Sequence, residues 1–393
     1  MVGVDEGSFL VIVGLAALAG LVTTLLAPRL VIPVVVLELG LGIAAGPQVA
    51  DVARLDAFTR FFGSLGLGML FFFAGYEIDF KRIRGRPLAL GAAAWIVSLA
   101  LAYGIGGLLA LAGVVLSLLY TGSALATTAI GTLIPILRDT GELRTRFGTH
   151  LLAAGALGEF GPILLVTLVL AGGQPLHEAA ILAAFVAVAV LTGVFAVRSA
   201  TRGWPLLERT FESSAQLAVR LTVVLVFGLV ALASELGLDL LLGGFVAGLI
   251  TRQALHGREE RVFESKVAAI GYGFLIPFFF VTSGMAFDAN ALVTSGSALL
   301  KLPLFLALFL VVRGVPALVV YRRELPALRD RAALAFYCAT ELPLVVAITT
   351  LAVDQGAMRP STAAALVGAS MLSTLIYPLV AMALRRPALA ATA

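Results

Sequence analysis

Long apolar segments, separated by short polar connections, make up most of the chain. Their length suits helices that cross a bilayer, which need about 20 mostly apolar residues. The second and ninth segments are short and rich in glycine. We predict thirteen membrane-spanning helices, at about residues 9–27, 30–47, 57–77, 87–112, 114–137, 149–171, 177–197, 216–236, 239–253, 264–286, 296–320, 331–353 and 360–384.

Composition leads to the same fold class, an all-α polytopic membrane protein. Of the 393 residues, 60% are hydrophobic and 13% are charged, whereas soluble domains carry about 25% charged residues. The segments have helix length and do not alternate as barrel strands do. The first segment follows Asp5 and Glu6, so it lacks the basic start of a cleavable signal peptide. Cys338 is the only cysteine, which excludes disulfides and cysteine metal sites.

The connections between the apolar segments alternate in charge. With the N-terminus outside, the connections that face inward hold 22 of the 27 Lys and Arg residues, and those that face outward hold 4. The positive-inside rule therefore predicts a cell-membrane protein with its N-terminus outside and its C-terminus in the cytoplasm. The excess of basic residues reflects topology, and no nucleic-acid partner is expected. We also expect no enzymatic activity, no cofactor and no soluble regulatory domain, so an ion gradient or the membrane potential must drive any transport.

Glu159 is the strongest candidate for a functional residue. It is the only charged residue in the 23-residue stretch Leu151–Gly173, and an ionisable group at membrane depth usually serves an ion or proton pathway. Pro162 lacks an N–H and clashes with the carbonyl of Gly158, so it leaves that oxygen free beside the carboxylate. A glutamate beside a free carbonyl can hold a small cation or a proton. The alternative is a structural glutamate that is salt-bridged within a helix bundle.

Three pairs of segments indicate an internal repeat. Leu37–Gly46 is similar to Leu241–Ile250, Phe71–Phe80 to Phe278–Asp288, and Ser123–Ile134 to Tyr337–Ile348. The partners are seven spans apart, and an odd number of spans inverts the second copy, as in secondary transporters. We predict one transmembrane domain over 1–393, with repeats at about 9–171 and 216–385 and a linker helix at about 177–197.

The fifth and twelfth spans have the composition of broken helices. The fifth carries Thr127 and Thr128 among other small and hydroxylated residues, and the twelfth carries Thr340, Glu341 and Pro343. Unwound backbone within a membrane occurs where it lines a cavity or is buried in protein, and such breaks form ion sites in transporters. Pro343 is expected to free the carbonyl of Ala339. The alternative is that these small residues only allow close helix packing.

These motifs resemble those of the monovalent cation:proton antiporters. Ile32–Pro47, with Glu38, is similar to the second helix of that family, and Met69–Arg84, with Glu77, is similar to the end of its third. Ala124–Leu143 is similar to its first broken helix. In the second half, LGGFVAGLI and FLIPFFFVTSGMAFD, which includes Ser283, match further family motifs.

The resemblance implies ion binding at Glu159, with Gly158, Thr127, Thr128 and Thr340 around it and with Glu38, Glu77 and Ser283 as secondary candidates. It also implies that Arg313, which lies where the family places a buried cation, pairs with Glu341, and it implies a homodimer. The family usually carries Asp, Asn or Gln followed by Asp where this chain reads Gly158-Glu159, and it often has Arg-Gly-Glu where this chain reads Ala339-Thr340-Glu341.

We therefore predict a secondary antiporter in which H⁺ and a monovalent cation, Na⁺ or K⁺, compete for Glu159. The absence of a second acid at Gly158 favours one proton per cation and electroneutral exchange. A sodium-coupled symporter of a small organic anion is the alternative, with Arg313 as the only candidate partner for the carboxylate of its substrate. A membrane scaffold or sensor would leave the polar residues at the midplane without a purpose.

Overall fold

The computed structural model describes residues 5–390, apart from 27–33, 79, 166–174, 202–215, 237, 239, 256–257, 288–289, 291 and 293–295. Each of the thirteen predicted spans contains helix, and no strand occurs among the described residues. Within the described part of the chain, eight helices are long and apolar enough to cross a membrane, and three shorter ones are also apolar. The predicted all-α membrane fold is thereby confirmed, whereas the end of the first repeat, at 166–171, lies outside the described residues.

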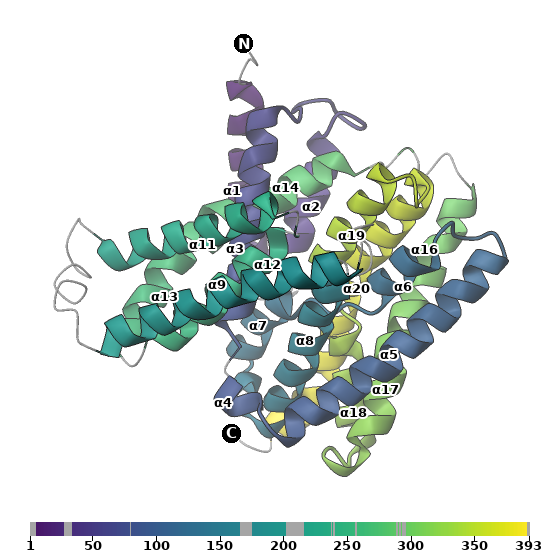
Figure 1. The fold of residues 1–393 in the computed structure, drawn as a ribbon. Coiled ribbons are helices and arrows are strands. Elements are labelled where there is room, and N and C mark those ends of the chain that lie inside the picture. The colour runs from purple at the N-terminus through teal and green to yellow at the C-terminus, as the bar shows by residue number, and fades with distance from the viewer. Residues whose placement is uncertain are drawn as a thin grey trace. The chain divides into compact units, whose positions relative to one another are not determined.

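The chain forms two compact units, and Figure 1 labels the helices that belong to them. Unit 1 comprises Met1–Ala17, Val52–Asp79 and Thr167–Ser283. Unit 2 comprises Leu18–Asp51, Phe80–Val166 and Gly284–Ala393. Each unit draws on both halves of the chain, so the units do not coincide with the predicted repeats, and the repeat boundaries stay a prediction.

Unit 1 is a bundle in which two helices touch backbone to backbone. A Cβ built on Gly248 of α12 would lie 2.0 Å from the carbonyl oxygen of Phe72 in α3, and one built on Gly75 of α3 would lie 2.0 Å from the oxygen of Phe245. Small residues permit such close approach between helices in a membrane. The helices that contribute to unit 1 are α1 (Glu6–Leu26), α3 (Ala57–Tyr76), α9 (Pro175–Thr201), α11 (Leu217–Glu235), α12 (Leu240–Ala254), α13 (Arg258–Ile270), a π-helical turn at Gly271–Leu275 and α14 (Ile276–Ala286).

Unit 2 contains the two broken helices. The first consists of α6 (Leu118–Leu125) and α7 (Ile130–Asp139), and the second of α18 (Leu328–Cys338) and α19 (Pro343–Asp354). Both breaks were predicted from the sequence and are confirmed. The other helices of unit 2 are α2 (Val34–Ala45), α4 (Phe80–Ile83), α5 (Arg86–Leu111), α8 (Arg146–Leu165), α16 (Gly296–Phe309), a π-helical turn at Leu310–Gly314, α17 (Val315–Val320) and α20 (Pro360–Ala390).

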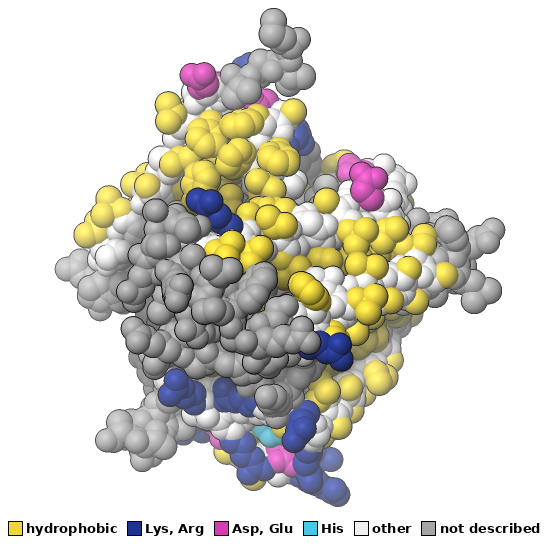
Figure 2. All heavy atoms as spheres, turned by 60° about the vertical axis from the view of Figure 1, so that its left-hand side comes forward, with side chains coloured by type: hydrophobic (Ala, Val, Ile, Leu, Met, Phe, Trp, Pro, Cys, Tyr) yellow, Lys and Arg dark blue, Asp and Glu magenta, His cyan; other side chains and the backbone are white. Residues whose placement is uncertain are grey.

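Large apolar side chains are exposed along several helices. Leu111 of α5 is 88% exposed and Phe195 of α9 is 71% exposed, and Figure 2 shows hydrophobic side chains over much of the visible surface. Monomeric soluble proteins rarely expose large continuous apolar patches, whereas a bilayer covers them. These helices therefore present the faces expected of lipid-exposed spans.

Candidate ion-binding site

The two breaks of unit 2 are bonded to each other. The N–H of Ala129, in the first break, donates to the carbonyl oxygen of Thr340, in the second, at 2.8 Å. The hydroxyl of Thr128 donates to the carbonyl oxygen of Cys338 at 2.6 Å. Backbone groups that a continuous helix would have satisfied are thus satisfied across the crossing, which allows unwound chain to be buried.

Glu159 belongs to α8, and its side chain lies next to the first residues of α7. Its side chain is buried, and the backbone N–H groups of Ile130 and Gly131 interact favourably with its carboxylate. The first N–H groups of a helix have no partner within the helix and carry a partial positive charge, so the carboxylate satisfies them. The second oxygen of Glu159, Oε2, is buried and has no partner among the described residues. One oxygen is therefore anchored and the other is free to bind an ion.

The carbonyl that Pro162 leaves free has found a different partner. α8 continues through Pro162, and the oxygen of Gly158 accepts a hydrogen bond from the N–H of Thr128 at 3.0 Å. The prediction that proline frees this oxygen is confirmed. Its consequence is a bond that ties α8 to the first break, because the free carbonyl attracts the nearest unsatisfied donor.

Pro343 acts differently from the prediction that it frees the carbonyl of Ala339. α18 already ends at Cys338, and Pro343 occupies the first turn of α19. A missing N–H removes no bond there. The carbonyls that serve the crossing are those of Cys338 and Thr340, on either side of Ala339.

A narrow pocket opens beside the carboxyl group of Glu159. The first break contributes Thr127, Thr128 and Ala129, and the second break contributes the chain from Leu342 to Leu344. Hard cations prefer oxygen ligands. The unpartnered carboxyl oxygen of Glu159 is a candidate ligand of this kind.

Glu341 is the second buried carboxyl group of the crossing, and its backbone is held by α20. Its Oε2 lies 3.1 Å from the hydroxyl oxygen of Thr127, and its Oε1 has no partner among the described residues. The hydroxyl of Ser373 accepts the N–H of Glu341 at 3.0 Å, and Thr374 donates to its carbonyl oxygen at 3.2 Å. Ser373 and Thr374 were not predicted, because hydroxyl groups within an apolar span more often serve helix packing.

Arg313 is buried, and its guanidinium contacts neutral oxygens. Nε and Nη2 donate to the hydroxyl oxygen of Thr128 at 2.9 and 2.8 Å, and Nη1 donates to that of Ser98 at 3.1 Å. Nη2 also donates to the carbonyl oxygen of Ala154 at 3.3 Å. The predicted pairing with Glu341 is not a direct contact, because no carboxylate among the described residues lies within 4.0 Å of this guanidinium. The two charges interact at longer range.

The remaining candidates lie in different places. Thr340 is buried, and its hydroxyl bonds back to the carbonyl oxygen of Phe336 at 3.2 Å. Glu38 is buried on α2 in unit 2. Glu77 follows the last residue of α3, and Ser283 lies in α14, so both belong to unit 1.

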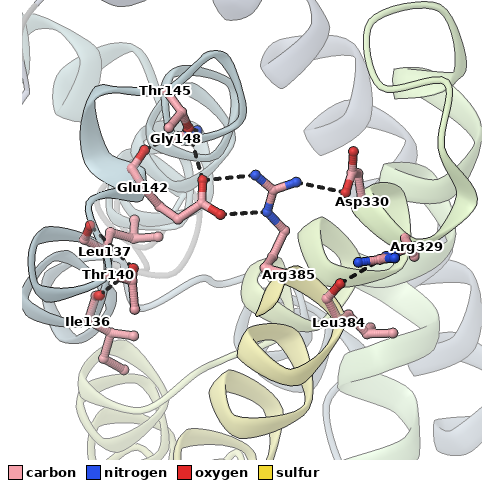
Figure 3. A network of polar contacts seen from close by, with 10 residues as sticks. All are labelled: Ile136, Leu137, Thr140, Glu142, Thr145, Gly148, Arg329, Asp330, Leu384 and Arg385. Carbon is pink, nitrogen blue, oxygen red and sulfur yellow. Dashed lines mark hydrogen bonds and ion pairs between the residues drawn. The ribbon is translucent and has the colours of Figure 1, made fainter. Parts of the chain in front are cut away.

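A second polar network lies at the end of α20 (Figure 3). Arg385 donates to both carboxylate oxygens of Glu142, at 2.6 and 3.0 Å, and to Asp330 at 2.7 Å. Its guanidinium also stacks over the ring of Phe147 at 4.3 Å. Because Glu142 follows α7 and Asp330 lies in the first turn of α18, one side chain ties together the far ends of both broken helices.

Comparisons with known proteins show the family to which the chain belongs. The family model described as "Sodium/hydrogen exchanger, transmembrane" matches residues 13–384. A putative Na⁺/H⁺ antiporter of Bacillus subtilis is 27% identical over 89% of the chain, and a Na⁺/H⁺-K⁺ antiporter of Bacillus cereus is 26% identical over 66%. The chain spans 59% of the first of these relatives and 67% of the second.

A solved structure has the same fold. The sodium proton antiporter MjNhaP1 of Methanocaldococcus jannaschii, at pH 8, superposes with a TM-score of 0.66 at 17% identity, over 96% of each chain. At this identity the likeness concerns the fold alone.

Proposed function

Because the chain belongs to the sodium/hydrogen exchanger family, we propose that it exchanges a monovalent cation, Na⁺ or K⁺, for H⁺, and that the two ions compete for Glu159. The observation that carries this proposal is the carboxyl group of Glu159, with one oxygen anchored by α7 and the other free beside the pocket. The relatives named as Na⁺/H⁺ and Na⁺/H⁺-K⁺ antiporters support both the proton and the choice of cations.

The exchange follows from what a carboxyl group with one free oxygen can hold. Protonated, Glu159 is neutral and rests in its apolar surroundings without a cation. Deprotonated, it is an uncompensated buried charge, which is costly, and a cation in the pocket removes that cost. The cation and the proton thereby exclude each other at the same oxygen, and no covalent step is involved.

The charges of the crossing support one proton per cation. Arg313 remains charged in all states, and it offsets one of the two buried carboxylates. We assign Glu341 to that role, which leaves Glu159 alone to take up H⁺ or the cation. The cycle is then electroneutral.

We extend the proposal to orientation and assembly. The end of unit 2 that carries Arg86, Arg146 and Arg385 faces the cytoplasm, and the N-terminus lies outside; both follow from the positive-inside rule. Alternating access proceeds by motion of unit 2 as one body, since both breaks and Glu159 lie within it. The protein works as a homodimer in the cell membrane.

The symporter alternative is not favoured by the geometry. A carrier of organic anions needs a cation that is available to the carboxylate of its substrate. Arg313 is occupied by four hydrogen bonds to Thr128, Ser98 and Ala154. The pocket itself is lined by one acid and no base.

The decisive test is transport in proteoliposomes that contain a pH dye, with Na⁺, K⁺ or Li⁺ added outside. Cation-dependent proton flux is expected for the wild type and for Glu159→Asp, which keeps the carboxylate, and none for Glu159→Gln. Glu235→Gln removes an exposed carboxylate from α11 and should leave transport unchanged. Full transport by Glu159→Gln would overturn the assignment of the site. Unequal charge counts in a voltage-clamped assay would overturn the stoichiometry.

A further inference from the structure

The place of a side chain at position 158 is already occupied. A Cβ built on Gly158 would lie 2.4 Å from Nη2 of Arg313 and 2.7 Å from the hydroxyl oxygen of Thr128. Atoms that are not bonded to a Cβ do not approach it so closely. The guanidinium of Arg313 therefore occupies the space that a side chain at position 158 would fill.

A π-helical turn places Arg313 beside Gly158. Arg313 lies in the π-helical turn Leu310–Gly314, between α16 and α17. Such turns insert an extra residue into a helix and recur at functional sites. From there the guanidinium reaches α5 through Ser98 and α8 through Ala154.

The hydroxyl of Thr128 has no capacity left for a cation. A hydroxyl offers one proton and two lone pairs. In Thr128 the proton goes to Cys338, and the lone pairs accept Nε and Nη2 of Arg313. The backbone N–H of Thr128 donates to Gly158. Thr128 thus joins three elements of unit 2 through its hydroxyl and its backbone N–H.

The position of Thr128 decides where α7 begins. Thr128 stands two residues before Ile130, whose N–H interacts with the carboxylate of Glu159, as does that of Gly131. The carbonyl oxygen of Thr128 also accepts the N–H of Ile130 at 3.2 Å. A shift of Thr128 would therefore also move the N–H groups of Ile130 and Gly131 relative to the carboxylate of Glu159.

We propose that Arg313 is a positioning residue. It occupies the space beside Gly158, hydrogen-bonds the hydroxyl of Thr128, and so keeps the N–H groups at the start of α7 directed at Glu159. Thr128 then acts as the link between Arg313 and α7, and its hydroxyl does not ligate the cation. In its transport readout this inference rests on the proposed function.

The test is a double-mutant cycle between Arg313→Met and Thr128→Val, read by exchange rate, by KM for the cation and by thermal unfolding. Each single variant is expected to slow exchange by about tenfold to hundredfold, as for the loss of a hydrogen bond to a charged group, with KM nearly unchanged. The double variant should be no slower than the worse single variant, because both remove one linkage. Thr128→Ser keeps the hydroxyl and should restore most of the rate.

Thr127→Val provides the matched control. Thr127 lines the same pocket, but its hydroxyl contacts Ala124 and Glu341 and not Arg313, so its effects should multiply with those of Arg313→Met. The proposal is overturned if Thr128→Val raises KM about tenfold and Arg313→Met does not, which would make Thr128 a ligand. Multiplying effects of Arg313→Met and Thr128→Val would also overturn it.

The thermal readout separates this inference from the proposed function. Non-additive shifts in Tm for Arg313→Met and Thr128→Val report the linkage even if the wild type carries none of the cations tested. Additive shifts in Tm reject the linkage whatever the transport result. An absence of exchange in the wild type with an intact thermal coupling would reject only the proposed function.

Discussion

Replacement of Arg385 by Met should destabilise unit 2 strongly, because it leaves the buried carboxylate of Glu142 without the guanidinium that neutralises it. The side chain of Glu142 is 1% exposed, and among the described residues it would keep only the hydroxyl of Thr145, at 3.0 Å, as a side-chain hydrogen-bond donor. Removal of one partner of a buried ion pair costs about 3–5 kcal/mol. Asp330 is 24% exposed, so water can replace Arg385 there at little cost. We expect a loss of about 3–5 kcal/mol in the free energy of unfolding.

The loss in the free energy of unfolding should arise from the unpaired negative charge of Glu142, and a second variant tests this. In Arg385→Met/Glu142→Gln neither charge remains, and neutral replacements of buried pairs are often tolerated without loss. Most of the stability should therefore return. Arg329→Met is the control, because Arg329 is exposed and its one hydrogen bond to a described residue goes to the carbonyl oxygen of Leu384. Surface changes of this kind stay within about 0.5 kcal/mol.

The assay is unfolding by SDS in mixed micelles, which compares free energies among the four proteins. A loss below about 1 kcal/mol for Arg385→Met would refute the reasoning, since it is far under the cost of a stranded buried charge. A double variant as unstable as the single one would show that the guanidinium acts through its packing on Phe147.

Three further outcomes are expected. Gly248→Ala should destabilise unit 1 by about 1–3 kcal/mol or more in SDS unfolding, because its Cβ meets a carbonyl of α3, whereas Gly228→Ala, with open space around it, should be neutral or slightly stabilising. Asp56→Ala should cost about 1 kcal/mol in the same assay, since Asp56 caps α3 in a capping box; an unchanged stability would contradict that role. Hydrogen bonding from Arg146, with the charge of Arg86 also contributing, holds the pKa of Glu324 below its usual value of about 4.5, so its contribution to stability is present above pH 4.5 and is lost as the pH falls through the lowered pKa. Tm should therefore fall less steeply below pH 4.5 in Glu324→Gln than in wild type, and parallel curves would refute this.

Local chemistry made much of the fold and the site predictable. Apolar length gave the helices, and a lone acid within an apolar segment marked Glu159. Prolines and clustered hydroxyl groups marked both breaks. Each of these signals lies within about ten residues of the feature it predicts. The free carbonyl of Gly158 was predictable for the same reason, because proline acts on the residue four positions before it.

The partners of these groups were not predictable, because they come from distant parts of the chain. Arg313 and Thr128 are separated by 185 positions, and Glu341 and Ser373 by 32. A charged pair is the simplest expectation for a buried arginine and a buried glutamate. The folded chain satisfies the arginine with hydroxyl and carbonyl oxygens, which the sequence offers in large numbers and without a distinguishing pattern.

Gly158 shows how an apparent gap in a motif is filled by the fold. In sequence, glycine next to Glu159 indicates the absence of a second acid. In space the same position holds the guanidinium of Arg313, so the crossing has a fixed positive charge where a side chain of α8 would stand. An acid at this position could not simply be added, because the guanidinium and Thr128 would first have to move. The charge balance of the site therefore depends on Gly158 as much as on the three ionisable residues around the crossing.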